Sequence, residues 1–189
     1  DMINDILDMA KVEAGKMRMD LRPIDASEPV DAAIRLIRRR AGDKGVSLLF
    51  DPEDDLPEVS GDHRALKQMT LNLVANAIKF TDAGGEIRVS VTAEGGWVVI
   101  RVADTGVGIA AADLPRLGQP FEQARSADGR NAGGTGLGLA LTKSFAEMHG
   151  GHLKLESELG VGTTVSVYLP AERRPPAGEA LPFAAIAAD

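Results

Sequence analysis

The sequence predicts an α+β fold: a two-layer sandwich of a mixed, roughly five-stranded sheet with about three helices on one face. Several stretches alternate apolar and polar residues, as half-buried strands do, and others repeat apolar residues every three or four positions, as core-facing helices do. These stretches do not follow a strict strand–helix–strand alternation. This order disfavours a doubly wound parallel sheet and favours helices gathered on one face.

Composition limits the class of protein. The 189 residues are enough for one domain with an appendage, and 44% hydrophobic and 26% charged residues are globular values. No window approaches the roughly 18 consecutive apolar residues of a membrane-spanning helix. The absence of cysteine excludes disulfides and cysteine-ligated metals. A net charge of -7 argues against nucleic acid as a partner.

Residues 1–20 are predicted to be the C-terminal stub of a helix from a preceding domain. Five residues form a narrow apolar stripe that requires a partner helix, as in a bundle or coiled coil: Ile3, Ile6, Leu7, Ala10 and Ala14. A helix packed within the present domain is the alternative.

A second helix is predicted over residues 27–41, with Ser27 as a candidate N-cap and Pro29 in the first turn. A short strand over 46–50 and an acidic loop over 51–55 follow.

The third predicted helix begins after Asp62, a candidate N-cap, and is closed by the glycines of residues 83–85. Asn72 and Asn76 are one turn apart on one face, and Lys79 joins them. Two amides and an ammonium on one side of a buried helix can hold a metal–phosphate group. Exposed positions that happen to be amides are the alternative. The apolar face of this helix consists of Leu66, Met69, Leu73, Ala77 and Phe80.

The rest of the chain is predicted to add a glycine-turned hairpin, a helix and two more strands. An irregular loop over about 110–134 is long enough to suggest a functional segment, and residues 171–189 are predicted to form a disordered tail. The elements are strands 87–92, 97–103, 152–157 and 163–169, and a helix over 137–148.

Two glycine-rich motifs suggest ligand contacts. The segment 104–109, DTGVGI, directly follows a strand; Asp104 can accept a hydrogen bond from an exocyclic amine, and its glycines allow close approach to a flat ligand. A simple turn is the alternative. The segment 133–139, GGTGLGL, precedes a helix, where free backbone N–H groups form an anion site. This segment lacks the Gly-Lys-Ser/Thr ending of a P-loop.

These motifs occur in a fixed order with PFEQ (120–123) and GVGTT (160–164). Together they resemble the catalytic ATP-binding domain of sensor histidine kinases, which has the Bergerat fold of the GHKL superfamily. The resemblance covers about residues 24–169. The segment NDILDMAKVEAGKM also resembles the end of the second helix of that family's dimerisation domain. The implied division is residues 1–20 as this helix stub, 21–170 as the catalytic domain, and 171–189 as the tail.

The resemblance implies ATP and Mg²⁺ as cofactors and assigns roles to residues. Asn76 would bind Mg²⁺, Asn72 and Lys79 would act near the phosphates, and Asp104 would accept from the adenine amine. Phe121 would pack the loop that folds over the nucleotide. The other implied nucleotide-binding residues are Phe80, Gly106, Gly108, Gly134, Gly136, Leu137, Gly138 and either Thr163 or Thr164.

No segment matches the family's phosphoacceptor motif. His63, His149 and His152 are expected to be structural or surface residues, which places the acceptor histidine upstream of Asp1. The chain is therefore expected to bind ATP without autophosphorylating. The implied partners are a histidine-bearing dimerisation domain, which would make the full protein a homodimer, and a response-regulator receiver domain. The implied location is the cytoplasm, with membrane anchoring of the full protein left open.

Two other functions are weighed against this one. The first is an ATPase of the same superfold, as in gyrase and chaperone domains; these place a carboxylate one turn before the metal-binding Asn. The corresponding residue here is Asn72, and an amide cannot act as a general base. The second is a degenerate kinase domain that holds nucleotide only to set a signalling conformation.

Overall fold

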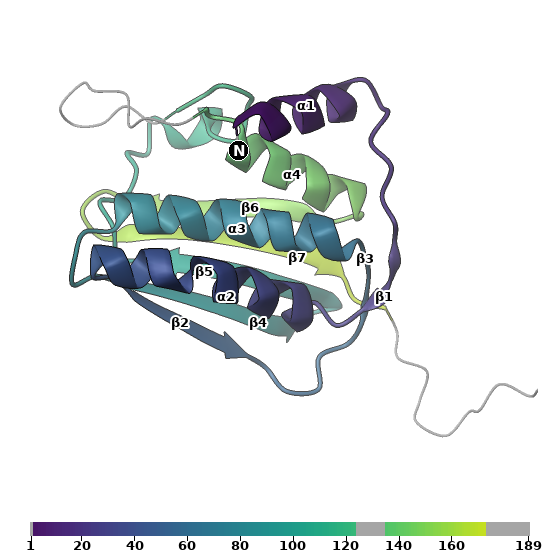
Figure 1. Cartoon of the computed structure of the whole chain (residues 1–189), viewed down its shortest axis with the longest axis horizontal. Helices are drawn as coiled ribbons and strands as arrows, with labels where there is room; N and C mark the ends of the chain where they lie inside the picture. Colours follow the sequence, from purple (N-terminus) through teal and green to yellow (C-terminus); the bar gives the residue numbers. More distant parts are fainter. Residues whose placement is uncertain (1, 124–134, 173–189) are drawn as a thin grey trace, which may run out of the picture.

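The computed structural model describes residues 2–123 and 135–172, and the predicted tail from residue 173 onward lies outside them. Three helices cover one face of a five-stranded sheet, and a fourth lies outside them (Figure 1). The helices are α1 (Met2–Glu13), α2 (Ser27–Lys44), α3 (His63–Phe80) and α4 (Gly138–Met148). The strands are β1 (Arg22–Ile24), β2 (Ser47–Pro52), β3 (Val59–Gly61), β4 (Glu86–Glu94), β5 (Trp97–Asp104), β6 (His152–Glu158) and β7 (Gly162–Pro170).

The large sheet has the order β2-β4-β5-β7-β6, in which β2 and β4 are parallel and the other pairs antiparallel. This confirms the predicted mixed five-stranded sheet and the α+β class. A second sheet of two strands was not predicted. It pairs β1 with β3, and β3 is too short, at three residues, for alternation to reveal it.

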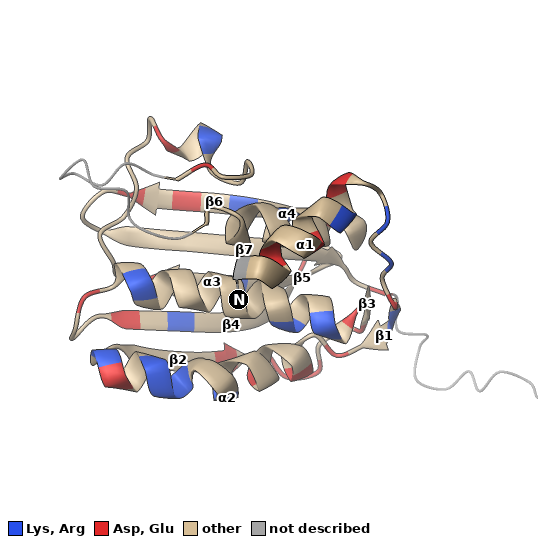
Figure 2. Ribbon diagram, turned by 45° about the horizontal axis from the view of Figure 1, so that its top comes forward, with Lys and Arg blue, Asp and Glu red and all other residues tan. Residues whose placement is uncertain are grey.

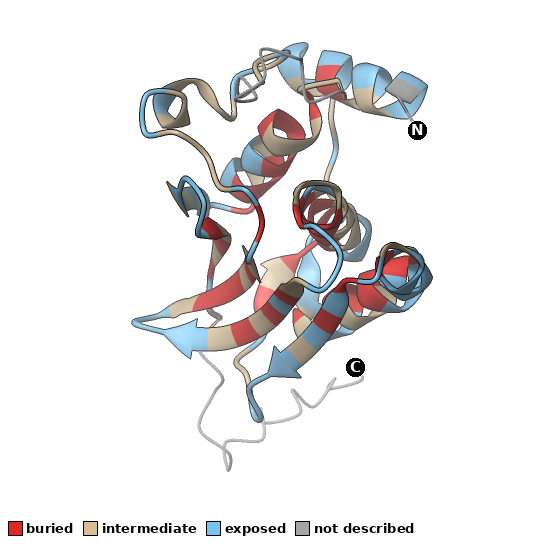
Figure 3. Cartoon of the chain, turned by 90° about the vertical axis from the view of Figure 1, so that its left-hand side faces the viewer, coloured by how far each residue is buried: buried red, intermediate tan, exposed pale blue. Residues whose placement is uncertain are grey.

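The core lies between the large sheet and the inward faces of α2, α3 and α4 (Figure 3). Alternate residues of β5, namely Val98, Ile100 and Val102, are buried on the helix-covered face. The equivalent residues of β7 are Val167 and Leu169. Asp104 and Thr163 continue these two rows, so both lie at the end of the core-facing side of the sheet.

Helix α2 begins differently from the prediction. Ala26, not Ser27, occupies the N-cap position, and Ser27 is the first helical residue. The carboxylate of Asp25 instead accepts a hydrogen bond of 2.8 Å from the Ser27 N–H. The helix continues past residue 41 to Lys44 and ends at Gly45, which has a φ of 74°. Acidic residues lie near the start of α2, and its last turns carry three successive arginines with Asp43 among the basic side chains (Figure 2).

Asp62 caps α3 as predicted, because its carboxylate accepts from the N–H groups of Arg64 at 2.8 Å and Ala65 at 3.2 Å. It also accepts from the N–H of Asp20 at 2.9 Å, so it anchors the segment that leads in from α1. The helix ends at Phe80, before the glycines of residues 83–85.

Helix α1 lies against α4 (Figure 1). Met9 is buried at 8% exposure, whereas Ile3, Ile6 and Leu7 are 73%, 47% and 52% exposed. The helix therefore contacts this domain and still leaves apolar side chains uncovered. Its membership of a preceding domain stays a prediction. Within residues 2–123 and 135–172, no helix combines the length and apolar character needed to span a membrane.

Candidate functional site

The polar face of α3 contacts the start of α4. The Asn72 amide accepts a hydrogen bond from the Gln68 side chain at 3.1 Å and donates to the Gly138 carbonyl at 3.3 Å. Asn76 lies one turn later and is exposed. Asn72 therefore connects the third helix with the glycine-rich segment before α4, while Asn76 faces outward beside that junction.

Lys79 supplies a cation at the end of the same face. Burial lowers the pKa of its ammonium below the ordinary lysine value, and its Nζ lies 4.7 Å from the centre of the Phe80 ring. No carboxylate lies within salt-bridge distance of Lys79 in the described parts of the chain. A partly desolvated, unneutralised ammonium is suited to bind an anion such as a phosphate.

The C-terminal end of α3 is held by groups from outside the helix. The Lys44 ammonium, at the end of α2, donates to the carbonyls of Ile78 and Lys79, both at 2.7 Å. The Phe80 carbonyl accepts from the N–H of Val107 at 3.1 Å. These bonds satisfy carbonyls that a helix end leaves unpaired. Sequence reasoning missed Lys44, because its partners lie 34 and 35 residues away.

The glycines after β5 are required by contacts within the chain. A Cβ on Gly106 would lie 2.4 Å from the Phe80 carbonyl oxygen, and one on Gly108 would lie 1.9 Å from that of Glu158. Gly108 also has a φ of +67°. The predicted reason for these glycines was close approach to a flat ligand. The contacts show a second reason: the segment packs so closely between α3 and the β6–β7 hairpin that these positions have no room for a side chain.

Asp104, Thr163 and Ser157 lie in one row across the ends of β5, β7 and β6. Asp104 lies opposite Thr163 in the strand register, and the hydroxyl oxygens of Thr163 and Ser157 are 2.8 Å apart. Thr164 belongs to the other face of β7, by alternation. Burial raises the pKa of the Asp104 carboxyl, although hydrogen bonds from the N–H groups of Gly106 and Thr163 oppose the shift. Sequence reasoning missed Ser157.

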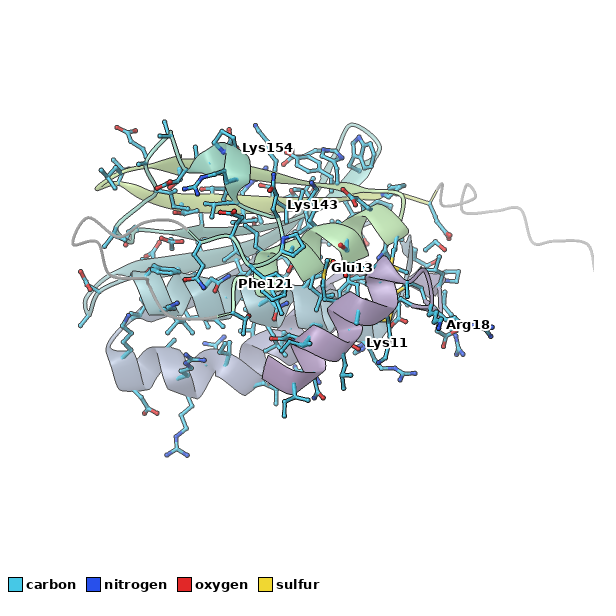
Figure 4. The ribbon with its side chains drawn as sticks, turned by 90° about the horizontal axis from the view of Figure 1, so that it is seen from above. Lys11, Glu13, Arg18, Phe121, Lys143 and Lys154 are labelled. Atoms are coloured by element: carbon cyan, nitrogen blue, oxygen red, sulfur yellow. The ribbon has the colours of Figure 1, made fainter. Side chains whose placement is uncertain are left out.

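The segment before α4 contacts the PFEQ motif. Gly136 has a φ of +70°, and a Cβ there would lie 2.7 Å from the carbonyl carbon of Phe121. Leu137 is fully buried, and its N–H donates to the Thr135 hydroxyl at 3.2 Å. The side chain of Phe121 is 68% exposed near the start of α4 (Figure 4). Gly134, and the loop that Phe121 was predicted to pack, lie outside the described residues.

A hollow of ≈ 480 Å³ opens beside the strand ends. It reaches Asp104 and Thr163 from the β6–β7 hairpin, with Glu156 and Thr164 also in its wall, but no residue of α3 lines it. The hollow therefore opens on the side of Asp104 and Thr163 that faces away from α3.

The histidines occupy the structural and surface positions expected of them. His149 is buried; its Nε2 accepts from the Asp62 N–H at 3.0 Å, and its Nδ1 lies 2.6 Å from the Phe145 carbonyl. These contacts identify the neutral form protonated at Nδ1. His63 and His152 are exposed.

Comparison with known proteins identifies the family. Residues 61–173 match the family model described as Histidine kinase-, DNA gyrase B-, and HSP90-like ATPase. Histidine protein kinase DivJ of Caulobacter vibrioides is 53% identical over 171 residues, which make up 90% of this chain and 28% of DivJ. Full-length ShkA, solved in complex with AMPPNP, is 32% identical, with a TM-score of 0.78 over 89% of this chain and 35% of ShkA.

The mycobacterial sensor histidine kinase MprB is 28% identical, with a TM-score of 0.69 over 79% of this chain and 98% of the solved one. The present chain thus spans only 28% of DivJ and 35% of ShkA. It belongs to the histidine kinase-, DNA gyrase B- and HSP90-like ATPase family and carries an ATP-binding catalytic domain of the histidine kinase type.

Proposed function

We propose that this domain binds Mg-ATP and transfers the γ-phosphoryl group to a histidine nitrogen on a dimerisation domain of the full-length protein. One observation carries the proposal: α3 is joined directly to both glycine motifs. Asn72 bonds to Gly138 at the start of α4, and the Phe80 carbonyl accepts from Val107 after β5. A polar face with an unpaired ammonium therefore lies between the half-buried Asp104 carboxylate and a helix N-terminus.

The base would be recognised at the strand ends. Asp104 would accept from the adenine amine, and Phe80 would line the pocket. Of the two candidate threonines, the structure favours Thr163, because it shares the helix-covered face with Asp104, whereas Thr164 does not. Gly106 and Gly108 hold the segment beneath the base through their contacts with α3 and the hairpin.

The phosphates would lie along α3 toward α4. Lys79 supplies positive charge, and the backbone N–H groups of Gly136, Leu137 and Gly138 lie at or before the start of α4. The Leu137 N–H must exchange its bond to Thr135 for one to phosphate. Gly134 is proposed to join this set on the resemblance alone.

The residues also fit a magnesium ion. Mg²⁺ takes oxygen ligands in an octahedral shell and keeps several waters. The exposed Asn76 amide can offer one oxygen, and the phosphates and water would complete the shell. When bound, Mg²⁺ neutralises phosphate charge. No three His, Asp or Glu side chains cluster as a metal site within the described ranges, so Asn76 is the proposed protein ligand.

The reaction breaks the bond between the γ-phosphorus and the oxygen bridging to the β-phosphate, and forms a phosphorus–nitrogen bond to the imidazole. ADP leaves with the bridging oxygen. The domain contributes positioning and positive charge and does little covalent work. Hydrolysis is disfavoured, because the Asn72 amide cannot take a proton from water and both its ends are hydrogen-bonded within the protein.

The remaining roles follow from the resemblance. We propose a homodimer in the full-length protein, a response-regulator receiver domain as the phosphoryl acceptor downstream, and a cytoplasmic location for this domain. The matched relative DivJ is named a histidine protein kinase. The net charge of -7 supports partners other than nucleic acid.

The test separates binding from transfer. Calorimetry should show that the chain binds ADP and Mg-ATP, while incubation with γ-labelled ATP should leave no stable label on it. Addition of the histidine-bearing helical hairpin of the full-length protein should yield labelled hairpin, weakly, because the two parts are no longer tethered. Stable self-labelling of the chain would contradict the proposal that the acceptor is elsewhere.

The Asn76→Ala variant tests the site itself. Alanine preserves the helix, so nucleotide binding should lose its dependence on Mg²⁺ and transfer to the hairpin should collapse. Asn4→Ala, at an exposed position of α1, is the matched control for binding. Undiminished, Mg²⁺-dependent transfer by Asn76→Ala would overturn the assignment.

A further inference from the structure

Ser157 is the centre of a hydrogen-bond network at the base end of the site. Its hydroxyl oxygen accepts from the Ile109 N–H at 2.8 Å and lies 2.8 Å from the Gly162 carbonyl oxygen. The Thr163 hydroxyl oxygen is a third neighbour, also at 2.8 Å. Ser157 therefore connects the glycine segment after β5 with the start of β7.

The number of protons decides the direction of each bond. A serine hydroxyl has one hydrogen and two lone pairs. The Ile109 N–H can only donate and the Gly162 carbonyl can only accept, so all three contacts are satisfied together in one arrangement alone. In it, Ser157 donates to Gly162, and Thr163 donates its own proton to Ser157. The Thr163 oxygen then presents only lone pairs to its remaining surroundings.

Asp104 lies opposite Thr163 in the strand register, and its carboxylate also offers only acceptors. An ionised carboxylate accepts hydrogen bonds and donates none. One of its oxygens already accepts from the Gly106 N–H at 2.8 Å. Asp104 and Thr163 are opposite each other in the register of β5 and β7, on the helix-covered face. The ends of these two strands therefore form an edge of hydrogen-bond acceptors.

We propose that Ser157 is a positioning residue for base specificity: by taking the Thr163 proton, it keeps this edge free of donors. Such an edge selects a base that carries an exocyclic amine, as adenine does, over a base with a carbonyl oxygen at that position, such as hypoxanthine. The inference rests on the proposed function, since it takes Asp104 and Thr163 to be the groups that contact the base.

The test compares the affinities of ATP and ITP, which differ at that position. Wild type should prefer ATP. In Ser157→Ala the Thr163 hydroxyl is free to donate to the ITP carbonyl, so the ATP-over-ITP affinity ratio should fall about three- to tenfold, the value of one hydrogen bond. Ser157→Thr keeps the hydroxyl and should keep the ratio. Ser166→Ala, on the other face of β7, is the matched control and should also keep it.

Thr163→Val supplies an independent variant, because it leaves the bonds of Ser157 to Ile109 and Gly162 intact. Thr163→Val should lower the ATP-over-ITP affinity ratio by a similar factor. Combining it with Ser157→Ala should not change this ratio further, because Ser157 acts through Thr163.

The contrary results are distinct. Equal losses of ATP and ITP affinity in Ser157→Ala, with the ratio kept, would show a purely structural role and overturn this inference alone. A ratio unchanged in Thr163→Val would overturn it as well. Wild type that binds neither nucleotide would instead contradict the proposed function.

Discussion

The Asp104 side chain, at the end of β5, offers a carboxylate that can recognise one particular group of a ligand. Asp104 is a half-buried carboxyl whose pKa is raised by desolvation, and it is kept in place by the N–H groups of Gly106 and Thr163. The ionised form of such a group costs free energy unless hydrogen-bond partners stabilise it. Carboxyl groups with shifted pKa values are common at functional sites. The orientation of Asp104 depends on backbone donors, so a substitution that keeps its shape tests its charge and its capacity to accept hydrogen bonds.

Asp104→Asn should weaken ADP binding about tenfold or more, because a hydrogen bond to a charged group contributes about 1.5–3 kcal/mol. The amide keeps the size of the side chain but can turn an N–H₂ group toward the adenine amine. Calorimetry with ADP measures the loss. Asp51→Asn, an exposed residue of β2, is the control. Unchanged ADP affinity in Asp104→Asn would show that the base binds elsewhere.

At the scale of elements, the position of α3 depends on bonds at both of its ends. Asp62 and His149 hold its start, and Lys44 and Val107 hold its end. Each of these bonds comes from another part of the chain or caps the helix directly. The site face of α3 is therefore oriented by groups that do not touch the nucleotide in the proposed arrangement.

Lys44→Met should loosen the end of α3. It leaves the carbonyls of Ile78 and Lys79 without their charged donor, so the free energy of unfolding should fall by about 1.5–3 kcal/mol. Nucleotide affinity should also fall, because Lys79 and Phe80 lie in this turn. Chemical denaturation and calorimetry measure the two effects.

The control for Lys44→Met is Lys143→Met, whose ammonium is 4.0 Å from Glu147 on exposed α4 surface. Lys44→Arg retains donors for both carbonyls and should restore most of the affinity. If Lys44→Met keeps both wild-type stability and wild-type nucleotide affinity, Lys44 has no positioning role.

The His149 contact predicts a dependence of stability on pH. Burial lowers the pKa of His149, while the bond to the Phe145 carbonyl and the charge of Asp62 oppose the shift. Because the unfolded chain binds this proton more readily, the stability contribution is complete above about pH 6.5 and is lost as pH falls through the lower folded pKa.

Urea unfolding of wild type between pH 7.5 and 5 should show this loss, and His149→Gln should show a smaller slope. Burial alone would raise the pKa of the Asp62 carboxyl, but hydrogen bonds from the N–H groups of Asp20, Ala65 and Arg64 outweigh it, so the pKa is lowered. Asp62 therefore affects stability only near and below its ordinary pKa of 3.8, outside the range of this experiment. His63→Gln, at an exposed position, is the control. An identical slope in wild type and His149→Gln would exclude His149 as the source.

At the scale of the whole molecule, the site and α1 are separable. All of the proposed nucleotide-binding residues belong to residues 21–170, and α1 contacts the domain on α4, with Met9 buried. The same helix leaves Ile3 and Leu7 exposed, which is consistent with a second partner for its apolar stripe.

Removal of residues 1–16 should therefore leave nucleotide affinity unchanged. The free energy of unfolding should fall by about 1.5–3 kcal/mol, the contribution of burying one large apolar side chain such as Met9. Calorimetry and denaturation measure the two quantities on the same preparation. Loss of nucleotide binding in a folded, shortened chain would show that α1 is part of the binding unit.

Elements whose signals are local could be predicted from the amino-acid sequence. Alternation identified β4, the glycine turn after it identified β5, and the apolar spacing with the Asp62 cap identified α3. Each of these signals acts within one strand, one turn or a few helical turns. The ordered glycine and asparagine motifs were sufficient to assign the family. Local signals were weaker elsewhere: the three-residue strand β3 was missed, and the N-cap of α2 was assigned to Ser27 instead of Ala26.

Contacts between groups far apart in the chain could not be predicted from the sequence. The strand order β5-β7-β6 brings Asp104, Thr163 and Ser157 into one row. The packing of α2 on α3 places the Lys44 ammonium within hydrogen-bond distance of the Ile78 and Lys79 carbonyls, 34 and 35 residues further along the chain. These contacts depend on register and on the packing of whole elements, which short-range periodicity does not encode. The motifs of the sequence therefore identify the family of this chain. The residues that position the proposed nucleotide-binding groups can be identified only from the contacts between the sheet and the helices.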